Sequence, residues 1–155
     1  MRQTFDIKGG PQDGRAHLPL LRKELGNMGL DGFYVPHDDE YQNEYIPAYA
    51  ERLMWATGFS GSAGAALILQ DKAIMFTDGR YTVQVRQQAD SAFFDYVDLM
   101  ETPPDVWLSE NAVSGARIGY DPMLHTMAGV QKLKTAAEKA GFELVAVMQN
   151  PVDAA

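Results

Sequence analysis

The sequence contains no cysteine among its 155 residues. Disulfide bonds, thiolate-bound zinc and cysteine nucleophiles are therefore excluded. Basic residues are also scarce, because 13 Lys and Arg stand against 21 Asp and Glu and leave a net charge of −8. That balance argues against nucleic acid or an anionic membrane surface as a partner, since both are bound by cationic faces.

Long apolar runs are missing as well, and no stretch approaches the roughly 20 residues that span a bilayer. Residues 1–6 show neither the apolar segment nor the cleavage-like site of a secretory signal. The composition, 46% apolar and 22% charged, is that of a globular protein, and the length suits one domain. We therefore expect a single soluble, cytoplasmic globular domain.

Residues 1–14 hold three glycines and a proline without periodic apolar residues, which predicts a flexible arm before a domain over 15–153. Apolar residues then recur at helical spacing over 15–28. Further helices are predicted over 51–55, 80–89, from 103 and from 127 to 140, and strands over 32–35, 65–69, 73–76, 93–99, 117–120 and 142–147.

The alternation of strands and helices places the chain in the α/β class. The segments 65–69 and 73–76 are almost continuously apolar and flank a connection of hairpin type. Such runs are typical of strands buried on both faces, and a hairpin between them makes the sheet mixed.

The segment 58–64, Gly-Phe-Ser-Gly-Ser-Ala-Gly, is the first candidate for chemistry. Its three evenly spaced glycines could cradle a phosphate, and Ser62 could act as a hydrolase nucleophile with His125 and an Asp. Both arrangements need a helix after the loop, whereas a strand is predicted here. The favoured interpretation is a close backbone approach that leads into a buried strand.

A metal site is the second candidate, because residues 37–40 read His-Asp-Asp-Glu. Neighbouring residues in extended chain point to opposite faces and do not converge on one cation. The other histidines lie in unrelated segments. We expect a solvated acidic loop and no metal ligands in this chain.

Two arginines remain. Asp78 and Gly79 favour a turn in which Asp78 caps the next helix, and Arg80 could pair with a nearby acid. Arg52 is open to two interpretations: an exposed surface charge, or a fork that lines a cleft and binds a carboxylate or carbonyl oxygen.

Taken together, these segments resemble a known family. Their order along the chain is similar to that in the amino-terminal domain of Xaa-Pro aminopeptidases, in the creatinase/prolidase superfamily. The segments that carry this resemblance are Tyr45-Ile46, Arg52, 58–64, Thr-Asp-Gly-Arg-Tyr at 77–81 and Gly-Tyr-Asp-Pro at 119–122. The resemblance covers about residues 15–153. Its structural motif residues are Gly58, Gly61, Ser62, Gly64, Asp78, Gly79 and Arg80.

The resemblance implies a mixed six-stranded sheet flanked by helices, similar to the ribonuclease H architecture. It also implies that catalysis takes place elsewhere. In relatives, a carboxy-terminal "pita-bread" domain holds two divalent metal ions, usually manganese, that activate water to cleave the bond before proline. That domain is absent from the 155 residues, so no catalytic residue, metal ligand or cofactor is expected in this chain.

The resemblance further implies dimer contacts and a wall around the substrate entrance. The expected partners are the chain's own C-terminal catalytic domain, a second copy and a proline-containing peptide. Arg52 matches the arginine at the substrate end of that wall and is expected to bind substrate. Tyr41 stands where many relatives have His, so that histidine's contacts are not carried over. Residues 150–153 resemble the junction at which the chain leaves the domain.

An alternative interpretation is a freestanding module of the same fold that binds a peptide or small amide without hydrolysing it. Phe33, Tyr34, Trp55 and Phe59 could line its pocket, although core positions are favoured for them. A reading frame that ends near residue 155 would support the module, and a much longer one would support the aminopeptidase domain.

Overall fold

The structure is a computed structural model that describes residues 10–36, 52–59, 64–77, 82–89 and 91–154. Along the chain the elements are α1 (Pro11–Asn27), β1 (Gly32–Pro36), α2 (Arg52–Thr57), β2 (Ala65–Leu69), β3 (Ala73–Thr77), α3 (Thr82–Gln88), β4 (Phe94–Asp98), α4 (Pro104–Asn111), β5 (Arg117–Tyr120), η3 (Pro122–Leu124), α5 (Met127–Ala140), β6 (Glu143–Ala146) and α6 (Pro151–Ala154). Strands and helices alternate as the apolar pattern predicted.

One six-stranded sheet, in the order β4-β3-β2-β1-β5-β6, forms the centre of the molecule. β2 is antiparallel to both of its neighbours, and Ala65 at its start lies opposite Pro36 of β1 and Phe76 of β3. All other neighbouring strands are parallel. The predicted hairpin and mixed sheet are confirmed, and the remaining strands share one carboxyl edge.

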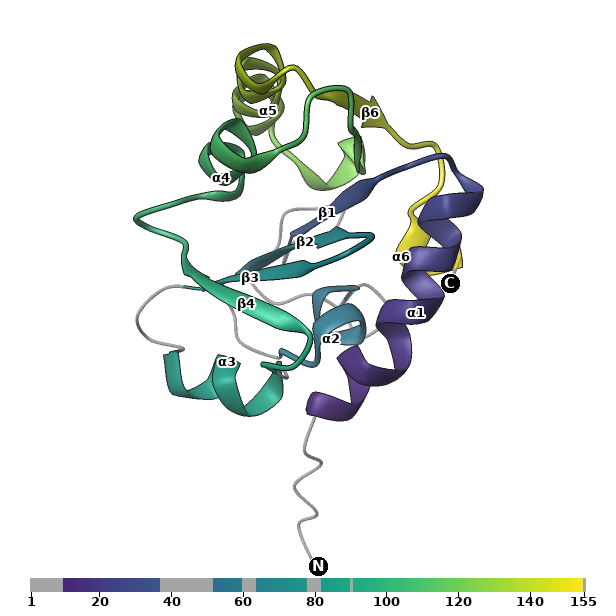
Figure 1. Cartoon of the computed structure of the whole chain (residues 1–155), viewed down its shortest axis with the longest axis vertical. Coiled ribbons are helices and arrows are strands. Elements are labelled where there is room, and N and C mark those ends of the chain that lie inside the picture. The colour runs from purple at the N-terminus through teal and green to yellow at the C-terminus, as the bar shows by residue number, and fades with distance from the viewer. Residues whose placement is uncertain (1–9, 37–51, 60–63, 78–81, 90, 155) are drawn as a thin grey trace, which may run out of the picture.

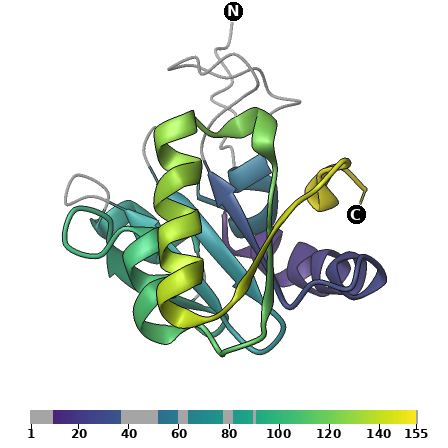
Figure 2. The same ribbon diagram turned by 90° about the horizontal axis from the view of Figure 1, so that it is seen from above.

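Helices cover both faces of the sheet (Figure 1). α1, α2 and α3 lie on one face and α4 and α5 on the other, with α5 crossing its face at the front of Figure 2. Strand residues alternate between the two layers: Phe33 and Val35 of β1 pack with Leu21 of α1, whereas Tyr34 packs with the cluster that contains Leu133 of α5. The sheet is therefore buried on both sides.

Helix α1 begins earlier than predicted. It starts at Pro11, so residues 11–14 of the arm predicted over 1–14 belong to the helix. Proline suits the first turn of a helix, where no amide hydrogen is needed. Gly14 is buried, and a Cβ there would lie 2.8 Å from the ring of Phe94. A buried glycine adds nothing to an apolar pattern, so this first turn was invisible in the sequence.

Helix α5 begins and ends where the sequence predicted. The Thr126 hydroxyl accepts a hydrogen bond from the Gly129 amide at 3.0 Å, which caps the amino end. Gly141 follows the helix with φ of +78°, the left-handed conformation that glycine adopts without strain. Both ends of this helix are thus specified locally.

The C-terminal segment does not leave the domain as predicted. Residues 151–154 form α6, which packs beside α1 and α2 (yellow in Figure 1). Asn150, Pro151 and Val152 are all buried. An Asn followed by Pro is a typical helix start, and the apolar Val152 then turns the short helix inward.

Candidate functional site

The carboxyl edge of the sheet includes described residues of two segments that carry the family resemblance, Thr77 and Tyr120. β1, β3 and β5 end there at Pro36, Thr77 and Tyr120. In α/β sheets, ligands bind beyond the carboxyl ends of the strands. Outside the described residues lie the predictions for 37–40, Tyr41, Tyr45, Gly61, Ser62, Asp78, Gly79 and Arg80.

Arg52, the first residue of α2, lies next to this edge and is buried. Its side chain is only 7% exposed. Arg52 Nε donates to Asp153 Oδ1 at 2.9 Å, and Nη2 donates to Oδ2 at 3.0 Å. This paired geometry is the strongest that arginine and a carboxylate form. The interpretation of Arg52 as an exposed surface charge is therefore wrong.

A second polar contact joins Asn150, the residue before α6, to the end of β5. Asn150 Nδ2 donates to Asp121 Oδ2 at 3.1 Å, and Asn150 Oδ1 accepts from the Val152 amide at 2.9 Å. Asp121 Oδ1 also accepts from the Met123 amide at 3.0 Å, which caps η3. We call Arg52, Asp121, Asn150 and Asp153 the clamp. It joins α2, the end of β5 and α6.

His125 lies next to the clamp, one residue after η3. Its ring meets those of Tyr34 and Tyr120 edge to face, with centroids 4.8 and 5.7 Å apart. Its buried Nε2 has no hydrogen-bond partner within the described ranges. Burial lowers the pKa of His125 below 6.5, and the nearby Asp121 carboxylate opposes that shift. Burial among these aromatic rings thus favours the neutral form of the imidazole.

Gly58 and Gly64 frame the glycine–serine segment. Gly58 has φ of +87°, and a Cβ there would lie 2.0 Å from the carbonyl oxygen of Gly10. Its own carbonyl accepts the Gly10 amide at 2.9 Å. At Gly64 a Cβ would lie 3.0 Å from the Phe76 carbonyl oxygen. Each position is a close backbone approach, and Gly58 has no room for a side chain.

The aromatic residues considered as a pocket lining are mostly occupied elsewhere. Phe33 and Phe59 are fully buried in the core. Trp55 is partly buried and stacks on His17 with ring centroids 4.0 Å apart, while His17 Nδ1 lies 2.6 Å from the Trp55 carbonyl oxygen. They do not form an open binding pocket together.

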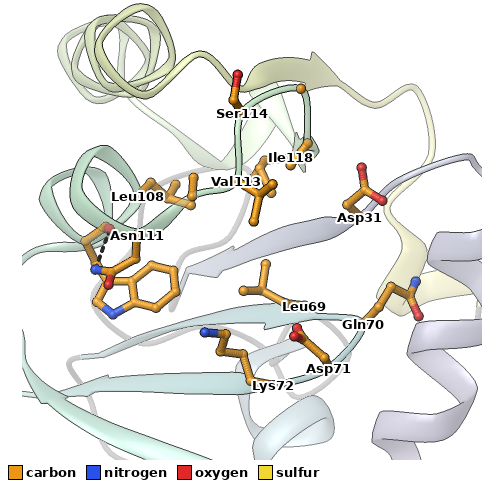
Figure 3. A pocket seen from close by; sticks show the side chains of 14 residues that line it. Asp31, Leu69, Gln70, Asp71, Lys72, Leu108, Asn111, Val113, Ser114 and Ile118 are labelled. Carbon is orange, nitrogen blue, oxygen red and sulfur yellow. Dashed lines mark hydrogen bonds between the residues drawn. The ribbon is translucent and has the colours of Figure 1, made fainter.

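A groove of about 450 Å³ opens at the other end of the strands, and we call it the amino-edge groove (Figure 3). Figure 3 shows Leu69, Leu108 and Val113 pointing into it. The Lys72 ammonium lies 5.7 Å from the centroid of the Trp107 ring at its border. The groove lies at the strand ends opposite the clamp, and no residue singled out from the sequence lines it.

No three His, Asp or Glu side chains come together as metal ligands in the part of the chain that the structure describes. Within the same residues, none of the helices is both long and apolar enough to cross a membrane.

Sequence reasoning found Arg52 but missed its partner Asp153 and the other two residues of the clamp. Asp153 is 101 residues away along the chain, and Asn150 and Asp121 were read only as parts of a junction and a strand end. One local signal was available, because Asn150 before Pro151 marks a helix start. Nothing local to Asp153 indicated the ion pair.

Comparison with known proteins places these residues in context. A family model, the creatinase/prolidase N-terminal domain, matches residues 18–152. Human Xaa-Pro aminopeptidase 2 is 34% identical over 136 residues, which is 88% of this chain and 20% of that protein. A probable Xaa-Pro aminopeptidase P from Aspergillus niger is 39% identical over 143 residues, 91% of this chain and 23% of that protein. The chain thus spans less than a quarter of these two curated relatives.

Solved structures agree with the fold. The X-prolyl aminopeptidase of Caenorhabditis elegans, described as a cytosolic enzyme with a di-nuclear active site, superimposes with a TM-score of 0.82 and 27% identity over 91% of this chain and 25% of that one. The N-terminal domain of the cytoplasmic peptidase PepQ from Mycobacterium tuberculosis H37Rv gives a TM-score of 0.65 and 25% identity over 90% of this chain and 97% of that one.

Proposed function

The chain belongs to the creatinase/prolidase N-terminal domain family, and on that premise we propose that it is the non-catalytic N-terminal domain of a metal-dependent Xaa-Pro aminopeptidase. The observation that carries the proposal is the match of nearly the whole chain to one part of much longer Xaa-Pro aminopeptidases. The chain's role is then to shape the surroundings of a reaction centre in a following domain.

In this proposal the carboxyl edge of the sheet forms a wall of the substrate entrance. That edge is where ligands of α/β sheets bind, and the clamp fixes α2 and η3 next to it. The partners are a following catalytic domain, a second copy of the chain and a peptide with proline in second position. The family resemblance predicts a substrate contact for Arg52, and the kinetics of Asp153→Asn described below test that prediction against a positioning role.

The metal ions of the proposed enzyme, two divalent cations with manganese expected, belong to the following domain. The described part of this chain holds no group of three ligand side chains that would suit them. A cytoplasmic location is also proposed, in line with the cytosolic relative from Caenorhabditis elegans.

The test uses the product of the complete reading frame that contains these residues. We expect it to cleave an Xaa-Pro peptide with added manganese. Arg52→Ala should lower kcat/KM about tenfold, the effect of about 1.4 kcal/mol in the transition state, with the metal content unchanged. A reading frame that ends near residue 155 would contradict the proposal and favour the freestanding module, as would a full-length protein that cleaves no such peptide.

A further inference from the structure

We infer that the clamp fixes the direction in which the chain leaves the domain, and that Arg52 is a positioning residue that acts through Asp153. The placement of α6 carries this inference. The part that concerns the orientation of a following catalytic domain rests on the function proposed above, whereas the fixed exit of the chain does not.

Helix α6 cannot hold its own position. It has four residues, Pro151–Ala154, far fewer than the roughly 12 to 15 that even a marginally stable isolated helix needs in water. The orientation of α6 must therefore come from its tertiary contacts.

Three different contacts supply that orientation. At the amino end, Asn150 joins α6 to Asp121 at the end of β5. In the middle, the buried Val152 side chain belongs to the core cluster that also contains Leu18 of α1 and Leu53 of α2. One residue later, Asp153 accepts both hydrogen bonds from Arg52. Contacts on three separate elements leave a short rigid helix little freedom to rotate or shift.

The geometry of the Arg52–Asp153 pair determines the orientation of the Asp153 carboxylate as well as its attraction to Arg52. A guanidinium fork that donates two parallel hydrogen bonds fixes the angle of the carboxylate as well as its distance. Asp153 is 45% exposed, so the pair contributes less to stability than a fully buried one. Its bidentate geometry makes it better suited to setting orientation than to stabilising the core.

The clamp also links the exit of the chain to the carboxyl edge. Arg52 is the first residue of α2, and Asp121 directly follows β5 at that edge. A chain that continues beyond residue 154 therefore starts from a position fixed relative to the proposed entrance wall. Displacements of about 1 Å far from the chemistry can lower rates about a hundredfold, so a fixed exit is what such a wall requires.

The absence of cysteine allows a direct test on the 155-residue chain. Lys134→Cys on the exposed surface of α5 and Ala154→Cys at the end of α6 provide two sites for nitroxide labels. Pulsed electron paramagnetic resonance then gives the distribution of distances between them. We expect a narrow distribution in this background and a broad one after Asp153→Asn, which removes the charge at nearly unchanged shape. Arg52→Gln should broaden it similarly.

The matched control is Glu143→Gln, which breaks the exposed contact between Arg117 and Glu143 and should leave the distribution narrow. If Arg52→Gln does not fold, Asp153→Asn carries the test, because Asp153 lies at the surface end of the pair. A distribution that is already broad without these substitutions, or one unchanged by Asp153→Asn, would overturn the inference. Neither outcome depends on peptide cleavage, so a failure of this inference can be distinguished from a failure of the proposed function.

A second experiment separates positioning from substrate contact in the full-length protein. If Arg52 acts through Asp153, then Asp153→Asn and Arg52→Gln lower kcat/KM for an Xaa-Pro peptide by the same factor. Normal kinetics for Asp153→Asn beside a clear loss for Arg52→Gln would mean that Arg52 itself touches the substrate, and would overturn the positioning role.

Discussion

The clamp and the amino edge of the sheet each hold an arginine–carboxylate pair, and the two pairs differ in burial and geometry. In the clamp, Arg52 is 7% exposed and makes two hydrogen bonds to Asp153. At the amino edge of the sheet, Arg117 at the start of β5 is 41% exposed, and its Nε lies 3.4 Å from Oε2 of Glu143, which is 62% exposed. Two arginine–carboxylate pairs in one small domain thus differ in burial and geometry, and only the first has the geometry that fixes an orientation.

Two glycines with similar backbone conformations also differ in how closely they are packed. Gly58, directly after α2, and Gly115, in the lining of the groove, both have positive φ, +87° and +84°. A Cβ at Gly58 would overlap backbone atoms of Gly10 and Gln88, whereas at Gly115 it would meet nothing within 4 Å. The surroundings of a residue, more than its type, decide how strictly its conformation is required.

The largest effect is expected from Gly58→Ala. The left-handed conformation and the overlap with Gly10 together should lower the free energy of unfolding by about 3 kcal/mol. Gly115→Ala carries the conformational cost alone and should lose about 1 kcal/mol. Urea denaturation of both variants measures the difference. Equal losses would mean that packing around Gly58 is looser than described.

The clamp should give the next largest effect. Arg52→Gln leaves the Asp153 carboxylate without its partner and should lower the free energy of unfolding by about 2 kcal/mol, a value reduced from that of a fully buried pair because Asp153 is half exposed. Glu143→Gln at the exposed pair should cost at most about 0.5 kcal/mol. If chemical denaturation gives both variants the same stability, the contrast between the two pairs is wrong.

A smaller, pH-dependent effect is expected from His125, next to the clamp. Burial lowers its pKa below 6.5 in the folded state, with Asp121 acting in the opposite direction. Below pH 6.5 the unfolded chain therefore binds more protons at this residue than the folded one, and stability falls as the pH falls. His125→Gln removes this contribution, so its stability should decline less between pH 7.5 and the folded pKa. Parallel curves for the two proteins would contradict a neutral, buried imidazole.

The smallest effect is expected in the groove. Lys72→Gln removes a cation that lies 5.7 Å from the Trp107 ring centroid. Contacts of this kind at exposed sites contribute about 0.5 kcal/mol, and thermal unfolding should detect only a slight loss. A loss as large as that of Arg52→Gln would show that the groove is as tightly held as the clamp.

The sequence predicted the parts of the fold that are specified locally. Apolar runs identified β2 and β3, and Thr126 and Gly141 marked the two ends of α5. These signals depend on residues close together in the chain, so they can be read without the structure. The order of the strands is different, because it depends on contacts between distant segments.

The clamp shows why the candidate site could be predicted only in part. Arg52 was singled out from the sequence, and the family resemblance then favoured a binding role for it, but its partner Asp153 lies 101 residues away. The start of α1 was missed because a buried Gly14 leaves no apolar signal. The inward turn of α6 depends on Val152 finding a place in a core formed by α1 and α2, which no local pattern reveals.

The most direct test of the account is a manganese titration of the isolated 155-residue chain by calorimetry, followed by incubation of the same sample with an Xaa-Pro peptide. A domain that only shapes the surroundings of a reaction centre should bind no stoichiometric metal and release no N-terminal residue. Two manganese ions bound per chain together with cleavage of the peptide would contradict it.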